Sequence, residues 1–129
     1  MDGGNQKLLE RLEDPALKAE ITDAILRNDG TWQNPLDSTG FDGMTVLHTK
    51  SHPECHGKSL AQLADEWDVE PVETIFRLLK ENDGQVNCLL HFMTDADVEA
   101  IFQSPLVSVC TDSLLFGEGM PTHPRGYST

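Results

Sequence analysis

Basic residues are scarce in this sequence. Of its 129 residues, nine are Lys or Arg and 22 are Asp or Glu, so the formal net charge is −13 at pH 7. A protein surface with this charge repels nucleic-acid phosphates and anionic lipid headgroups. The composition therefore argues against nucleic acid and membrane surfaces as partners. The simplest role of so many carboxylates is to keep the protein in solution.

Long apolar runs are also missing. No stretch approaches the ~20 apolar residues that are needed to cross a bilayer. Residues 1–4, Met-Asp-Gly-Gly, lack both the basic region and the apolar core of a secretory signal peptide. We therefore expect a cytoplasmic protein.

Cysteine is rare. The three cysteines are Cys55, Cys88 and Cys110, and the last two lie in short apolar runs. An odd number of cysteines in such surroundings favours buried free thiols over a disulfide framework.

Hydrophobic periodicity and turn residues divide the chain into five parts. The length is that of one domain, since domains of about 100–150 residues are the commonest. The predicted parts are a helical segment at 1–30, a loop with a short strand at 31–58, a helical hairpin at 59–84, a strand, helix and strand at 85–113, and a loop at 114–129. Three helix starts carry capping signals, namely Asp14 before Pro15, Ser59 with Gln62, and Thr94 with Asp97.

The most informative part is the strand, helix and strand at 85–113. Its last strand is the apolar, β-branched run at 106–111, which follows Pro105 and precedes Asp112. One helix between two strands in so short a segment is typical of a right-handed βαβ unit with parallel strands. We therefore predict an α/β fold that is mainly helical with a small parallel sheet. Asp112 is expected at the carboxyl end of a buried strand, which is where α/β barrels carry their chemistry.

Asp112 is the first candidate for a functional residue. A carboxylate at that position can bind a metal, take a proton from a metal-bound water, or hold a substrate donor. Two residues of the following loop, His123 and Arg125, are expected near it. The alternative is an aspartate that only caps the next turn.

A second candidate is the cluster of His48, His52, Cys55 and His56. It offers three or four nitrogen and sulfur ligands within nine residues, and such ligands suit zinc. The spacing matches no standard zinc finger, and no second ligand pair follows to complete a tetrahedral structural site. The alternative is a solvated loop with incidental histidines.

Several short motifs occur in a specific order. They are Gly57-Lys58-Ser59-Leu60, then His91-Phe92-Met93-Thr94-Asp95, then Thr111-Asp112-Ser113, and finally His123-Pro124-Arg125-Gly126-Tyr127. In this order the motifs resemble the C-terminal portion of the N-acyl-D-amino-acid deacylases (D-aminoacylases) of the amidohydrolase superfamily. The opening, with Gly3-Gly4 and the run at 9–15, is similar to the segment that this family carries after its sixth barrel strand. The resemblance covers nearly the whole chain.

The resemblance implies a zinc-dependent hydrolase with a (β/α)8 barrel, of which this chain would be a fragment. In that family zinc polarises the amide carbonyl and lowers the pKa of a bound water, and an aspartate at the end of the last strand passes the water proton to the leaving amine. Asp112 matches this aspartate. His123, Arg125 and Tyr127 match the loop beyond it, where they would line the substrate pocket or brace the barrel mouth. The implied substrate is an N-acyl-D-amino acid.

The chain departs from the family in its metal ligands. The family's zinc-binding histidines lie on earlier strands, and none of His48, His52 and His56 matches them. Family members also continue beyond the tyrosine, whereas this chain reads Ser128-Thr129. We therefore expect one part of an enzyme, which holds no zinc tightly and hydrolyses nothing alone.

Two other interpretations stay open. One is a non-catalytic binding or regulatory module that docks on a partner chain. The other is a small zinc-binding protein that uses His48, His52, Cys55 and His56. A parallel unit of two strands also leaves its strand edges uncovered. We therefore expect either a homodimer or association with the missing part of the barrel.

Overall fold

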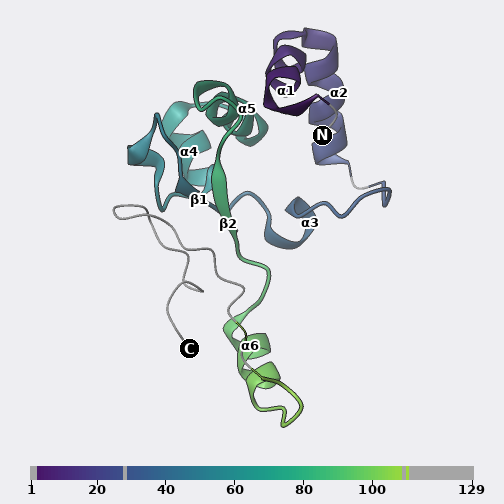
Figure 1. The fold of residues 1–129 in the computed structure, drawn as a ribbon, viewed down its shortest axis with the longest axis vertical. Helices are drawn as coiled ribbons and strands as arrows, with labels where there is room; N and C mark the ends of the chain where they lie inside the picture. The colour runs from purple at the N-terminus through teal and green to yellow at the C-terminus, as the bar shows by residue number, and fades with distance from the viewer. Residues whose placement is uncertain (1–2, 28, 109, 111–129) are drawn as a thin grey trace. The chain divides into compact units, whose positions relative to one another are not determined.

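A computed structural model of the protein describes residues 3–27, 29–108 and 110 (Figure 1). The chain divides into two units, Met1–Leu90 and His91–Thr129. The first contains α1 (Gly4–Glu13), α2 (Pro15–Leu26), α3 (Leu36–Thr39), β1 (Met44–His48), the 3-10 helix η1 (Pro53–Cys55), α4 (Leu60–Trp67), α5 (Pro71–Glu81) and β2 (Asn87–Leu90). The second contains α6 (Asp95–Phe102). Among the described residues, no helix is both long enough and apolar enough to cross a membrane.

The sheet has two strands, and they are antiparallel. β1 pairs with β2 so that Met44 lies opposite Leu90 and His48 lies opposite Asn87. The prediction of a small parallel sheet is therefore wrong for the described residues. The reason lies in the connection, because α4 and α5 return the chain to the end of β1 from which it left. A strand that starts there runs backwards along β1, whereas a single crossover helix gives a parallel strand.

The last strand of the predicted βαβ unit is not formed in the described part of residues 106–111. Leu106 lies in a turn, and residues 107, 108 and 110 have no regular secondary structure. Leu106 is 94% exposed, and Val107 is also exposed. The prediction depended on β-branched composition, which favours a strand only where neighbouring strands and a covering layer are present.

The main core forms where the sheet packs against the helical hairpin of α4 and α5. Alternation along β1 buries Met44 and Val46, while the residues between and after them are less buried. The buried cluster consists of Met44, Val46, Cys55, Leu60, Leu63 and Leu78. The hairpin predicted at 59–84 therefore supplies one wall of this core, and η1 supplies Cys55.

Each capped helix start that the sequence predicts is found in the structure. The Asp14 side chain accepts backbone hydrogen bonds at the start of α2. Capping boxes join Ser59 with Gln62 in α4 and Thr94 with Asp97 in α6. The Thr94 hydroxyl donates to the Asp97 carboxylate, which lowers the pKa of that carboxyl. These contacts satisfy backbone N–H groups that a helix leaves without partners in its first turn.

A second buried cluster joins the two N-terminal helices to α5. Leu12 of α1 packs with Val72 and Phe76 of α5, and Ile21 and Ile25 of α2 pack against the same cluster. Phe76 is only 2% exposed. This cluster is the apolar contact that places α1 and α2 on the hairpin.

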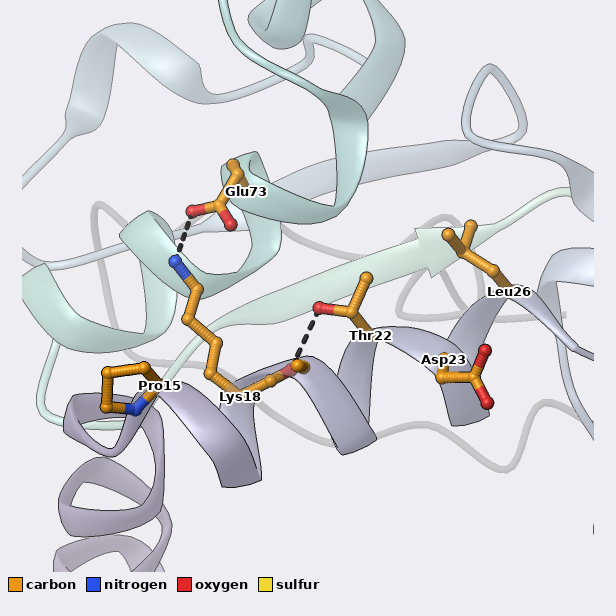
Figure 2. A pocket seen from close by; sticks show the side chains of 7 residues that line it. Pro15, Lys18, Thr22, Asp23, Leu26 and Glu73 are labelled. Atoms are coloured by element: carbon orange, nitrogen blue, oxygen red, sulfur yellow. Dashed lines mark hydrogen bonds and ion pairs between the residues drawn. The ribbon is translucent and has the colours of Figure 1, made fainter.

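Two ion pairs lie beside the second cluster. Lys18 pairs with Glu73 (Figure 2), with Nζ 2.6 Å from Oε2, and Lys80 Nζ lies 2.6 Å from Glu13 Oε1. Lys18 Nζ also lies 5.3 Å from the centroid of the Phe76 ring. Ion pairs between partly exposed side chains such as these contribute about 0–1 kcal/mol each to stability. The apolar cluster therefore holds these helices together more strongly than the charges do.

All three cysteines are free, as predicted, but the prediction of burial holds for only one of them. Cys55 is fully buried, whereas Cys88 and Cys110 are exposed. Cys88 lies in β2, which has a neighbouring strand on one side only in the described sheet. A barrel strand would be covered more completely.

Candidate functional site

The loop between β1 and α4 brings several metal-binding side chains together, and its own polar contacts fix its shape. The carbonyl oxygen of His52 accepts from Thr49 Oγ1 at 2.7 Å and from the Cys55 N–H at 3.0 Å. The Ser51 N–H donates to Oδ1 of the buried Asn82 at 2.8 Å. Since Asn82 ends α5, the loop is tied to the helical hairpin.

His48 and His56 are part of the packing of this loop. His56 Nε2 accepts a hydrogen bond from the Thr49 N–H at 2.9 Å, so the lone pair of that nitrogen is already used. The two imidazole rings have centroids 5.3 Å apart and an interplanar angle of 41°. His48 Nδ1 is buried and has no hydrogen-bond partner among the described residues. His48 and His56 therefore contact each other within the loop packing.

His52 lies between two carboxylates. Its Nδ1 is 2.8 Å from Glu54 Oε1, and its Nε2 is 2.5 Å from Glu81 Oε2. Its ring meets that of Trp67 edge to face, with centroids 6.3 Å apart. Arg77 stacks on Trp67, with Cζ 4.2 Å from the ring centroid, and its Nε is 3.1 Å from Glu81 Oε1. Contacts from α4 and α5 therefore hold the imidazole in one orientation.

Cys55 completes a group of three different ligand types. The donor atoms of His52, Glu54 and Cys55 all lie within 4.8 Å of one another. Burial raises the pKa of the Cys55 thiol, and the hydrogen bond with His52 lowers the pKa of the Glu54 carboxyl. Nitrogen, oxygen and sulfur donors of these kinds are the ligands that zinc takes in proteins.

The structure changes the predicted ligand set. Of the four predicted residues, His52 and Cys55 meet, whereas His48 and His56 pair with each other. Glu54 was not predicted as a ligand, although it stands between His52 and Cys55 in the sequence. Glu81 was not predicted either. No local motif indicates it, because only the packing of α5 beside the loop brings its carboxylate to His52.

The residues predicted from the family resemblance lie outside the described residues. They are Asp112, His123, Arg125 and Tyr127. Their proposed roles stay predictions.

A shallow groove of about 440 Å³ lies along α2 (Figure 2). Lys18 reaches from this groove to Glu73, and Thr22 Oγ1 donates to the Lys18 carbonyl oxygen. Asp23, which also lines the groove, pairs with Arg27 at 2.8 Å. The charged groups in the groove therefore already have partners, and they do not converge on a point where a substrate would react.

Comparisons of the chain with models of protein families, with curated proteins and with solved structures find no match.

Proposed function

We propose that this chain is the C-terminal part of a zinc-dependent amide hydrolase of the N-acyl-D-amino-acid deacylase type, located in the cytoplasm. The order of motifs, from Gly57-Lys58-Ser59-Leu60 to His123-Pro124-Arg125-Gly126-Tyr127, supports this assignment. The observation in the structure that supports it best is the apolar surface that the described residues after Leu90 expose.

Residues 91–108 expose large apolar side chains that a self-contained domain would bury. α6 has no buried residue, and Leu106 is almost fully exposed. The exposed large apolar residues of this segment are Phe92, Met93, Ile101, Phe102, Leu106 and Val107. Covering a fully exposed side chain of this size would contribute about 1.5–3 kcal/mol, and covering the partly exposed ones would contribute less. Such a surface is expected for a segment that packs against barrel elements supplied by another segment.

In the proposed enzyme, histidines of barrel strands outside this chain would hold the zinc ion. The bound ion would polarise the amide carbonyl and lower the pKa of the attacking water. Asp112 would take a proton from that water and pass it to the leaving amine. His123, Arg125 and Tyr127 would lie beside Asp112, where they would line the pocket for the N-acyl-D-amino acid.

The isolated chain is expected to hydrolyse nothing, because it carries the acid without the family's metal ligands. The measurement is the release of D-methionine from N-acetyl-D-methionine with added zinc. The matched control is the Asp112→Asn variant. Neither protein should release D-methionine faster than buffer alone does. Turnover by the unmodified chain above that of the variant would show that this prediction is wrong.

The exposed surface of residues 91–108 also favours a second candidate, a binding module that docks on another chain. A second copy of this chain is the simplest such partner, since it would cover the same apolar surface. Sedimentation velocity separates the two candidates. A tight dimer of the chain alone supports the binding module, whereas a surface that is covered only after addition of the barrel portion supports the hydrolase.

A further inference from the structure

Three side chains of different chemistry converge at η1, and the backbone there is fixed before any ligand binds. His52 precedes η1, and Glu54 and Cys55 belong to it. The His52 carbonyl oxygen accepts hydrogen bonds from both Thr49 Oγ1 and the Cys55 N–H. The tight turn brings an imidazole, a carboxylate and a thiol within 4.8 Å of one another.

We propose that His52 Nδ1, a Glu54 carboxylate oxygen and Cys55 Sγ form a zinc site that is separate from the chemistry of Asp112. Ligand atoms around a tetrahedral zinc ion lie roughly 3.3–3.8 Å apart, given bond lengths of about 2.0–2.3 Å. The donor atoms of this group lie within 4.8 Å of one another, and the 2.8 Å contact between His52 Nδ1 and Glu54 Oε1 would lengthen to admit the ion. The proposal does not depend on the hydrolase assignment, since none of its residues matches the ligands of that family.

The contacts on the other side of His52 are those of a metal-binding histidine. Its Nε2 lies 2.5 Å from Glu81 Oε2, so Nε2 can keep its proton when Nδ1 loses the hydrogen bond to Glu54 and binds the ion. Metal-bound histidines commonly give their second N–H to a carboxylate in this way. Arg77 holds Glu81 through its Nε and stacks on Trp67, against which the His52 ring also packs. These contacts orient the imidazole toward Glu54 and Cys55.

The contact between His52 Nδ1 and Glu54 Oε1, 2.8 Å long, lies where the ion would bind. Binding of a divalent ion would release the proton of this hydrogen bond and the Cys55 thiol proton to solvent. The ligands would then be a neutral imidazole, a carboxylate and a thiolate, which together neutralise the ion. A thiolate ligand favours zinc or cobalt over magnesium and calcium, which prefer oxygen.

An ion bound by His52, Glu54 and Cys55 would have the core on one side and solvent on the other. Cys55 is fully buried in the main core, whereas the Glu54 side chain is 64% exposed. The ion would therefore reach the site from solvent along Glu54. Three protein ligands leave a fourth position for water or for a ligand from outside the chain, as in zinc sites that are not purely structural.

The test is a titration of the full chain with Co²⁺ under reducing conditions, followed by displacement with Zn²⁺. Cobalt bound to a thiolate gives a sulfur-to-cobalt charge-transfer band in the near ultraviolet, which reports on Cys55 directly. We expect one cobalt per chain and loss of the band when zinc is added. The Glu81→Gln variant should bind cobalt about 10- to 100-fold more weakly. The Glu54→Gln variant should bind it at least as weakly, because Glu54 is a direct ligand, and Cys55→Ser should lose the band.

The control is the Cys88→Ser variant, which removes a thiol from β2 and should keep both the band and the affinity. Because Cys55 is buried, circular dichroism checks the folding of Cys55→Ser, and the two exposed glutamate variants test the site without changing the core. Absence of the band in the unmodified chain would overturn the proposal. The same follows if Cys55→Ser keeps the band, or if Glu54→Gln and Glu81→Gln bind cobalt as tightly as the unmodified chain.

Discussion

Replacing Phe76 by alanine is expected to lower the free energy of unfolding by about 3–5 kcal/mol. Phe76 is 2% exposed and packs with Leu12 and Val72 where α1 and α2 meet α5. Alanine would remove most of that apolar contact and leave a cavity that the surrounding helices fill only in part. A loss of this size is a large share of the roughly 5–15 kcal/mol that stabilises a typical domain.

Urea denaturation followed by circular dichroism measures the effect of Phe76→Ala. Leu26→Ala is the matched control, because Leu26 lies in α2 but is exposed and should cost much less. If both variants unfolded at the same urea concentration, the second cluster would not hold the N-terminal helices to the hairpin.

Replacing Asn82 by alanine is expected to lower the free energy of unfolding by roughly 1–3 kcal/mol and to weaken metal binding. The Asn82 side chain is buried and makes two hydrogen bonds of 2.8 Å. Its Oδ1 accepts from the Ser51 N–H, and its Nδ2 donates to the Leu78 carbonyl oxygen. Alanine removes both, and it frees the residue that precedes His52. The loop should then hold the His52 imidazole less firmly.

The effect of Asn82→Ala is measured by urea denaturation and by the cobalt titration. Asn87→Ala is the control, since Asn87 is exposed at the start of β2. Unchanged stability in Asn82→Ala would show that the two hydrogen bonds are not important. Lower stability with unchanged cobalt affinity would show that Asn82 does not position the loop.

The starts of α2, α4 and α6 were predictable because their signals are local, whereas α3 and η1 lie in the segment at 31–58 that was predicted as a loop with a short strand. Asp14, Ser59 and Thr94 each contact backbone groups within three residues, so a short stretch of sequence contains the whole interaction. The direction of the sheet was not predictable in the same way. It depends on which strand pairs with β2, and the sequence pattern favoured the run at 106–111 over β1.

The candidate metal site was predictable only in part. The spacing of His52 and Cys55 indicated possible ligands, but the same pattern also included His48 and His56. The contact of His56 with Thr49 and the contact of His52 with Glu81 distinguish the two pairs. Both contacts depend on how the loop folds back and on how α5 lies beside it, and no spacing along the chain encodes that.

The central claim is that Asp112 serves a zinc-dependent amide hydrolase whose metal ligands lie on another segment. The most direct measurement uses an N-acyl-D-amino-acid deacylase barrel that is truncated after its sixth strand, mixed with this chain, zinc and N-acetyl-D-methionine. We expect a complex that releases D-methionine, and a complex with Asp112→Asn that does so at least about 100-fold more slowly. Failure to form a complex, a complex without turnover, or equal rates with and without Asp112 would contradict the claim.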